Sequence, residues 1–177
     1  MKILLLVMMM FQTAKWTQEP KTFRGIPIGG SMTEVKKMFP TSLTCENPSS
    51  ETFICALYNA YIGDENPFEF INLFFVPDKL DQVIASFPVG RYDVLRSAFV
   101  QLYGPPHKRE LSQIKTKLGI PYDQEILSWS GANVMVTLSR YSENVERGRL
   151  HIVTKTYSDR FAKEEKQKVD RLQKALQ

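Results

Sequence analysis

Few residues in this 177-residue sequence have the types and spacing of a catalytic group. Ser112 and Lys115 stand in "SQIK", which matches the S-x-x-K pattern of serine acyl enzymes. The companion motifs S-D-N and K-T-G are absent, and a chain this rich in serine and lysine contains roughly one such match by chance. His107 and His151 are the only histidines, and neither stands near a cysteine in the sequence. We assign no catalytic residue and expect the protein not to be an enzyme.

Phosphate and metal binding are the next chemistries to consider. The glycine-rich segment "GIPIGG" at residues 25–30 lacks the lysine of a Walker loop and the strand-to-helix context of a phosphate cradle. Asp64 with Glu65 and Asp78 with Asp81 are acidic pairs in expected turns, where carboxylates more often face solvent than bind calcium. We therefore expect no cofactor and no metal site.

The two cysteines, Cys45 and Cys55, have a spacing that fits neither a C-x-x-C redox pair nor a zinc knuckle. In an oxidising compartment this spacing favours a local disulfide, which would contribute about 2 to 3 kcal/mol by restricting the unfolded chain. Two buried free thiols are the alternative.

The N-terminus, "MKILLLVMMMF", places Lys2 before an apolar run that is too short to span a bilayer at about 20 residues per helix. This pattern is typical of a secretory signal, which we assign to residues 1–14, with a polar linker over residues 15–22. We expect a periplasmic or secreted protein without a stable transmembrane anchor. A buried N-terminal strand is the alternative interpretation.

The composition is that of an ordinary globular protein, with 43% hydrophobic and 24% charged residues and a formal net charge of +4. Much of the positive charge stands in the last twenty residues or so, and no dense basic segment alternates with aromatic residues. Nucleic-acid binding is therefore not expected.

Helix signals open two successive regions of the chain. Ser31 and Glu34 form the pattern of a capping box, and Pro40 ends the helix that follows. A second amphipathic helix, "RYDVLRSAFVQLYGPP", ends at Gly104, and its apolar stripe comprises Tyr92, Leu95, Ala98, Phe99 and Leu102. After each helix the hydrophobic period changes to two, which predicts strands over residues 52–62, 67–76, 79–87, 125–131, 133–141 and 148–156.

The order of elements predicts an internal duplication. Residues 23–88 and 89–157 each contain a helix followed by three strands, and the polar stretch 107–123 is given no element. The predicted fold class is α+β, with two tandem α-β-β-β units, one antiparallel sheet of about six strands and helices packed on one face. Two separate small domains would have the same element order. A charged helix follows over residues 158–177, with a thin apolar seam of Phe161, Val169, Leu172 and Leu176.

Several of these segments carry a family resemblance. "GIPIGGSMTEVKKMFP" and "LRSAFVQLYGPP", each followed by three strands, resemble the units of the BamE (SmpA) outer-membrane assembly lipoproteins. The tandem form is similar to the β-lactamase inhibitory protein fold, in which a disulfide follows the first helix and a concave sheet face binds a partner protein. The resemblance implies an exported binding module. The acylated cysteine of the lipoproteins is absent from this chain.

The second predicted strand of each unit distinguishes two faces of the sheet. Alternation predicts that Ile71 and Leu73 in the first unit, like Val136 and Leu138 in the second, face the helices. The opposite side is mostly polar in the second unit, apart from Met135. In the first unit it carries Phe68, Phe70, Asn72 and Phe74.

These outward aromatic residues suggest a binding surface. A strand that is apolar on both faces is either buried on both or offers one face to a partner. We therefore predict that Phe68, Phe70, Phe74 and Met135 bind another protein or a cell-envelope component. Alternatively, the linker with Trp16 or the C-terminal helix with Phe161 covers this surface within the same molecule. A structural role in envelope assembly, with the C-terminal helix docking to a partner, is the alternative function.

Overall fold

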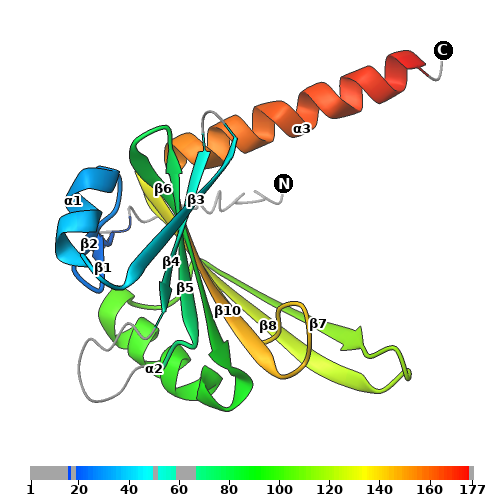
Figure 1. Ribbon diagram of the computed structural model, residues 1–177. Coiled ribbons are helices and arrows are strands. Elements are labelled where there is room, and N and C mark those ends of the chain that lie inside the picture. Colours follow the sequence, from blue (N-terminus) through cyan, green and yellow to red (C-terminus); the bar gives the residue numbers. More distant parts are fainter. Residues whose placement is uncertain (1–15, 17–18, 50–51, 59–66, 176–177) are drawn as a thin grey trace, which may run out of the picture.

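The computed structural model describes residue 16 and residues 19–49, 52–58 and 67–175 (Figure 1). The predicted signal peptide over residues 1–14 lies outside the described residues. The described elements are β1 Thr22–Phe23, β2 Ile26–Pro27, α1 Met32–Met38, β3 Leu43–Ser49, β4 Thr52–Tyr58, β5 Phe70–Val76, β6 Lys79–Pro88, the 3-10 helix η1 Val89–Arg91, α2 Tyr92–Tyr103, β7 Lys108–Lys115, β8 Pro121–Ser130, β9 Val134–Ser139, β10 Arg147–Thr154 and α3 Lys155–Ala175.

A large antiparallel sheet forms the centre of the molecule, which confirms the α+β class. Within the described ranges it contains eight strands in the order β3-β4-β5-β6-β10-β9-β8-β7. At its middle β6 pairs with β10, with Leu150 opposite Ala85 and Ile152 opposite Val83. The prediction of about six strands was too low, because it omitted the two strands at the edges, β3 and β7.

Both omitted strands have sequences without the apolar alternation that marks a half-buried strand. In β7, "KRELSQIK", every side chain except that of Ile114 is exposed. In β3, "LTCENPS", the pairing with β4 shifts register between Glu46 and Ser49. An edge strand is paired on one side only, so it tolerates the proline in this segment. Strands that bury few apolar side chains lack the hydrophobic periodicity from which strands are predicted in a sequence.

The helix α1 begins as the sequence predicted. Ser31 Oγ accepts a hydrogen bond from Glu34 N at 3.2 Å, and Ser31 N donates to Glu34 Oε2 at 3.4 Å, so the capping box is confirmed. The helix buries Met32 and Val35 against the sheet. It ends at Met38, just before Pro40.

The helix α2 buries Tyr92, Leu95 and Phe99, which are three of the five residues on its predicted apolar stripe. Leu102, also on that stripe, is instead 62% exposed. The helix stops at Gly104, whose carbonyl oxygen accepts a hydrogen bond from Trp129 Nε1 at 2.9 Å. This bond ties the end of α2 to β8.

The hydrophobic core lies between the sheet and the helices α1 and α2, which Figure 1 shows on the same side of the sheet. Ile71 and Leu73 of β5 and Val136 and Leu138 of β9 are almost fully buried in this core. The predicted orientation of both strands is therefore confirmed.

The helix α3 follows β10 directly and extends away from the body of the molecule (Figure 1). Its first turns contact β6 and β10 on the sheet face opposite α1 and α2. No helix in the described ranges is both long and apolar enough to cross a membrane.

Candidate binding face of the sheet

The sheet face that α1 and α2 leave uncovered is named the open face. Its extent follows from the strand register, because residues directly opposite each other on neighbouring strands point to the same side. On the four central strands it comprises Phe70, Asn72 and Phe74 of β5, Gln82, Ile84 and Ser86 of β6, Arg149, His151 and Val153 of β10, and Met135, Thr137 and Ser139 of β9.

Three of the four predicted binding residues lie on the open face. Phe74 and Met135 belong to one cross-strand row, separated by Gln82 and Val153, and Phe70 lies two rows further along β5, beyond Asn72. Their side chains are half-buried. The structure thus brings these residues onto one surface, where each side chain is partly exposed.

Phe68 has a different location. It is 7% exposed, and its ring meets those of Phe23 and Phe87 at centroid distances of 5.7 and 6.3 Å. Because β5 begins only at Phe70, the alternation of the strand does not extend back to residue 68. The structure places Phe68 in the core, which corrects its predicted place on the outward face.

The helix α3 covers one end of the open face. A cavity of about 340 Å³ lies between this helix and the sheet, and its walls include Phe74, Tyr157 and Phe161. The alternative that the C-terminal helix covers the aromatic surface therefore holds for Phe74. Phe70 is not among the residues that line this cavity.

A buried carboxylate holds α3 in this position. Asp81 is 6% exposed and lies where the pairing of β5 with β6 skips a residue. Its Oδ2 accepts from Arg160 Nη2 at 2.6 Å, and its Oδ1 accepts from the hydroxyl of Thr154. The same hydroxyl accepts from Tyr157 N at 3.1 Å and so caps the start of the helix.

The centre of the open face contains a neutral histidine. Gln82 Nε2 lies 2.7 Å from His151 Nε2, and because an amide nitrogen can only donate, the imidazole nitrogen must accept. Burial, and secondarily the charge of Arg149, lower the pKa of His151 to about 4. Arg149 itself forms an ion pair with Glu143 at 2.7 Å. No pattern in the sequence indicated this arrangement.

The N-terminal segment lies elsewhere and does not cover the open face. Trp16 is 8% exposed, donates from Nε1 to the carbonyl oxygen of Tyr103 at 3.1 Å, and meets the rings of Tyr103 and His107 edge to face. These residues belong to the end of α2 and the segment that follows it. The alternative that Trp16 covers the aromatic surface is therefore wrong.

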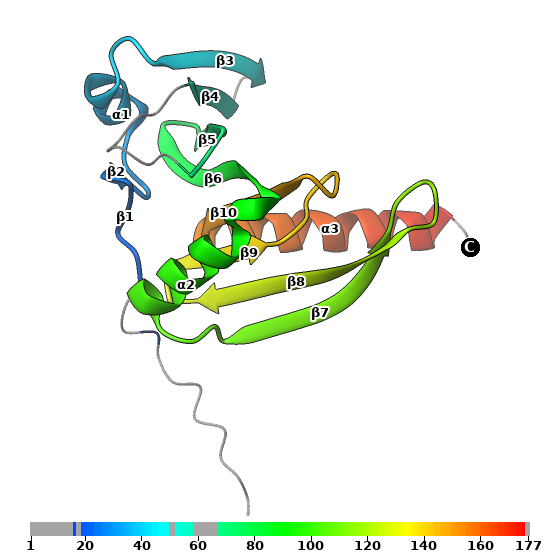
Figure 2. The ribbon, with the colours of Figure 1, turned by 90° about the horizontal axis from the view of Figure 1, so that it is seen from below.

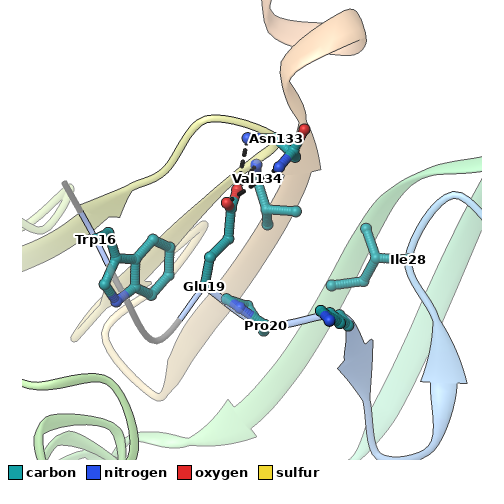
Figure 3. Close-up of a pocket in the computed structure, with 7 residues that line it drawn as sticks. Trp16, Glu19, Pro20, Ile28, Asn133 and Val134 are labelled. Carbon is teal, nitrogen blue, oxygen red and sulfur yellow. Dashed lines mark hydrogen bonds between the residues drawn. The ribbon is translucent and has the colours of Figure 1, made fainter.

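Glu19 connects the same N-terminal segment to the turn between β8 and β9 (Figure 3). Its Oε1 accepts from the backbone nitrogens of Asn133, at 2.6 Å, and Val134, and its Oε2 accepts from Asn133 Nδ2 at 3.2 Å. A cavity of about 550 Å³ beside these contacts is lined by Trp16, Glu19, Pro20, Lys21, Ile28, Asn133 and Val134.

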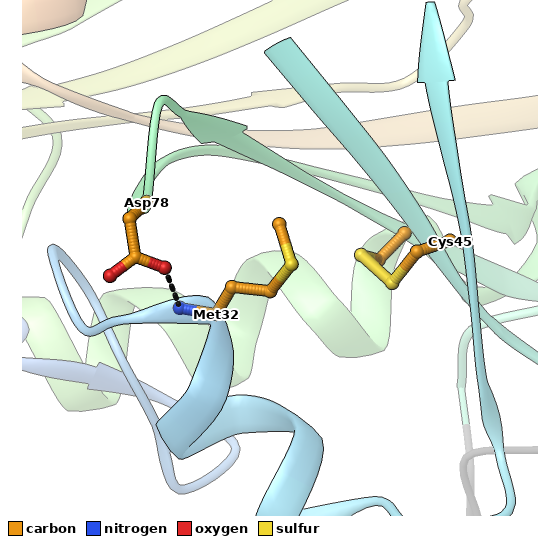
Figure 4. Close-up of a disulfide and its surroundings, with 4 residues drawn as sticks. Met32, Cys45 and Asp78 are labelled. Carbon is orange, nitrogen blue, oxygen red and sulfur yellow. Dashed lines mark hydrogen bonds between the residues drawn. A yellow bond between two sulfur atoms is a disulfide. The ribbon is translucent and has the colours of Figure 1, made fainter. Parts of the chain in front are cut away.

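The predicted disulfide between Cys45 and Cys55 is confirmed, and it joins β3 to β4 (Figure 4). Cys55 is fully buried in the core. Asp78, one of the acidic turn residues, accepts two hydrogen bonds from Met32 N near the disulfide, through its backbone oxygen at 3.0 Å and its Oδ1 at 3.3 Å. Asp64 and Glu65 lie outside the described residues.

The remaining candidate groups make structural contacts or are not brought together. Ser112 and Lys115 are three residues apart on β7, so their side chains point to opposite faces of the strand. Gly29 of the glycine-rich segment has φ of 77° and donates to the backbone oxygen of Leu80 at 2.9 Å. His107 Nδ1 accepts from Ser130 N at 2.8 Å. Across the described ranges, no group of three metal-ligating side chains is close enough to hold an ion.

A second buried carboxylate, Glu125 on β8, is surrounded by donors from α2 and β7. Its Oε2 accepts from Tyr92 Oη at 3.0 Å, its Oε1 lies 2.5 Å from Arg109 Nε, and Arg96 Nε is 3.7 Å away. Burial by itself would raise the pKa of Glu125. The hydrogen bonds from Arg109 and Tyr92 and the charges of both arginines outweigh burial and lower this pKa below its ordinary value. The cluster fastens α2 to the second half of the sheet.

Comparison with known proteins gives no relationship to build on. No protein-family model matches the sequence, and neither a curated protein nor a solved structure matches it significantly.

Proposed function

We propose that this protein is an exported, non-enzymatic binding module whose open sheet face binds another protein or a cell-envelope component. The single observation that carries this proposal is the composition of the open face. There Phe70, Phe74 and Met135 lie half-buried beside hydrogen-bonding groups, on the side of the sheet that α1 and α2 leave uncovered. A surface with apolar anchors among polar groups is typical of a protein interface.

Two tandem units form the framework of this proposal. The chain runs α1-β3-β4-β5-β6 and then α2-β7-β8-β9-β10, and the last strands of the two series pair at the middle of the sheet. This order supports a duplication in which each unit has one helix and four strands. The proposed similarity to the BamE lipoproteins and to the β-lactamase inhibitory protein fold rests on three strands after each helix, so the additional edge strand of each unit departs from that pattern.

Export to the periplasm or the cell exterior is supported by two features. The N-terminal sequence has the pattern of a secretory signal, and a disulfide between neighbouring strands is typical of proteins in an oxidising compartment.

The test is a double substitution on the open face, Phe70→Ser with Phe74→Ser. Chemical crosslinking of the cell-envelope fraction, followed by mass spectrometry, would identify proteins captured by the wild type. We expect the double variant to lose that capture, because both apolar anchors are removed from the interface. Val94→Ser with Leu102→Ser on α2 is the matched control, since both residues are more than half exposed on another surface.

Two results would contradict the proposal. Undiminished capture by a folded Phe70/Phe74 variant would show that the partner binds elsewhere. Unfolding of that variant would show that the two phenylalanines are needed for the core.

A second candidate function is docking through α3, as part of an envelope assembly. The observation that favours it is the exposed apolar seam of the helix, where Phe161, Val169 and Leu172 are 51%, 50% and 65% exposed. A chain that ends after Glu165 keeps the ion pair between Arg160 and Asp81 and loses only the outer part of the helix. Capture lost in this truncated chain and kept in the Phe70/Phe74 variant would favour α3 as the docking element.

A further inference from the structure

The β7–β8 hairpin presents apolar side chains far from both the open face centre and the core. At the turn between its strands, Leu118 is 87% exposed and Ile120 is 49% exposed. Among the large hydrophobic residues of the described ranges, Leu118 has the most exposed side chain. Figure 2 shows this turn at the far end of two long strands, away from α1 and α2. Exposed apolar patches mark protein or membrane interaction sites, and Leu118 and Ile120 place two exposed apolar side chains on one turn.

The turn itself is held in a defined shape. Thr116 N donates to the backbone oxygen of Ile120 at 3.0 Å, Gly119 N donates to that of Thr116 at 2.9 Å, and Ile120 N donates to Thr116 Oγ1 at 3.2 Å. Gly119 has φ of 81°, a conformation that glycine adopts without strain. Leu118 is therefore presented on an ordered turn.

The hairpin is also braced by the loop between β9 and β10. The rings of Tyr122 and Tyr141 meet edge to face at 5.7 Å. Gln124 donates from Nε2 to the backbone oxygen of Tyr141 at 2.8 Å and accepts from Tyr141 N at 3.0 Å. These contacts join the outer part of the hairpin to the loop between β9 and β10.

Two lysines flank the apolar turn. Lys115 and Lys117 are exposed, and in the part of the chain that the structure describes neither forms an ion pair. Two acidic groups lie on neighbouring segments: Asp123 on β8 accepts from Gln113 at 3.4 Å, and Glu143, which lines a cavity with both lysines, is paired with Arg149. The turn thus combines a protruding leucine with two exposed lysines that form no ion pair in the described ranges.

We infer that the hairpin turn, residues 115–120, binds the surface of an anionic lipid membrane, with Leu118 and Ile120 in the acyl boundary and the two lysines at the headgroups. Apolar side chains gain by leaving water at the membrane interface, and lysine stems extend their ammonium groups back to the phosphates. The charge complementarity favours this occupant over an apolar protein pocket, in which both ammonium groups would lose water. The membrane contact is peripheral and independent of the proposed partner on the open face.

The experiment is co-sedimentation of the purified protein with vesicles of phosphatidylglycerol and phosphatidylcholine in roughly equal parts, and with vesicles of phosphatidylcholine alone. We expect binding to the anionic vesicles that weakens as salt is added. Leu118→Ser should weaken the binding about tenfold or more, because it removes a buried apolar side chain from the bound state. Leu102→Ser, at an exposed leucine on α2, should leave the binding unchanged.

A second pair of variants tests how much the lysine charges contribute to vesicle binding. Lys115→Gln with Lys117→Gln should weaken binding to anionic vesicles about tenfold, since each lysine near the surface contributes to attraction. Lys36→Gln with Lys37→Gln on α1 removes the same charge from another surface and should have little effect. Circular dichroism would confirm that all four variants are folded.

Three outcomes would overturn the inference. One is no binding of the wild type to anionic vesicles. The second is equal binding by the Leu118 variant and its Leu102 control. The third is a photoreactive residue at position 118 that crosslinks to an envelope protein and not to lipid. The Phe70/Phe74 variant should bind vesicles like the wild type, because its substitutions lie on the open face. The membrane inference and the proposed function can therefore fail independently of each other.

Discussion

Buried polar side chains do much of the positioning in this protein. Asp81 fixes the start of α3, and Glu125 fastens α2 to β7 and β8. At the centre of the open face His151 is held neutral by Gln82 and by burial. Carboxylates and histidines are the residues that a search for catalysis examines first. Their contacts here are structural, because each is paired with a group from another element.

His151 makes the free energy of unfolding depend on pH. Its pKa falls from 6.5 to about 4 on folding, so between these values the unfolded chain binds a proton that the folded chain excludes. Stability should therefore decrease as the pH falls below about 6.5 and level off near the folded pKa. Urea unfolding at about pH 7 and about pH 5 measures this change while the pH stays above the ordinary pKa values of carboxyl groups.

The control for that measurement is His151→Gln, which should flatten the change in stability over this interval. A wild-type free energy of unfolding that is equal at the two pH values would show that folding leaves the pKa of His151 unchanged.

At the scale of elements, the two edge strands of the sheet differ in how they are secured. The edge strand β3 is linked to β4 by the disulfide between Cys45 and Cys55. The edge strand β7 is joined to β8 by an unbroken register over eight residue pairs and has no such link. The disulfide therefore secures the edge strand whose pairing is irregular.

Replacing both cysteines, Cys45→Ala with Cys55→Ala, should lower the free energy of unfolding by about 2 to 3 kcal/mol, because the unfolded chain regains its freedom. Hydrogen exchange of the β3 amides should quicken, while that of the β7 amides should not. The measurements are denaturant unfolding and hydrogen exchange followed by mass spectrometry. Equal quickening of both edge strands would indicate a global loss of stability instead of a local one.

At the scale of the whole molecule, the N-terminal segment connects the two halves of the sheet. Near its end, Gly29 and Gly30 exchange backbone hydrogen bonds with Leu80 at the start of β6. Near its beginning, Glu19 accepts hydrogen bonds from the β8–β9 turn. The segment predicted as a polar linker therefore has a structural role. Trp16 is the only large hydrophobic residue in that predicted linker, and so the only one whose type suggested burial.

Glu19→Ala should destabilise the protein by about 1 to 3 kcal/mol, because the backbone nitrogens of Asn133 and Val134 lose their acceptor. Gly131→Ala should act on the same contact, since its added methyl group would lie 2.5 Å from Cδ of Glu19. Urea unfolding of the two single variants and the double variant forms a thermodynamic cycle. We expect the double variant to lose less free energy of unfolding than the two single variants lose in sum. Strictly additive losses would mean that the two sites act separately.

The sequence alone determined those features that depend on neighbours along the chain. The capping box of α1, the ends of both core helices and the inward sides of β5 and β9 follow from local hydrogen bonding and from periodicity, so all were predictable. The pairing of Cys45 with Cys55 was predictable because the chain has only these two cysteines, at a sequence separation of 10 that allows a local disulfide.

Only the tertiary structure decided the features that depend on distant contacts. The edge strands β3 and β7 exist because a neighbouring strand offers them hydrogen bonds, although their side chains bury little. Phe68 is buried because Phe23 and Phe87 lie against it, and His151 is neutral because Gln82 and burial surround it. In each case, the burial or pairing comes from residues far away in the sequence, which no local pattern encodes.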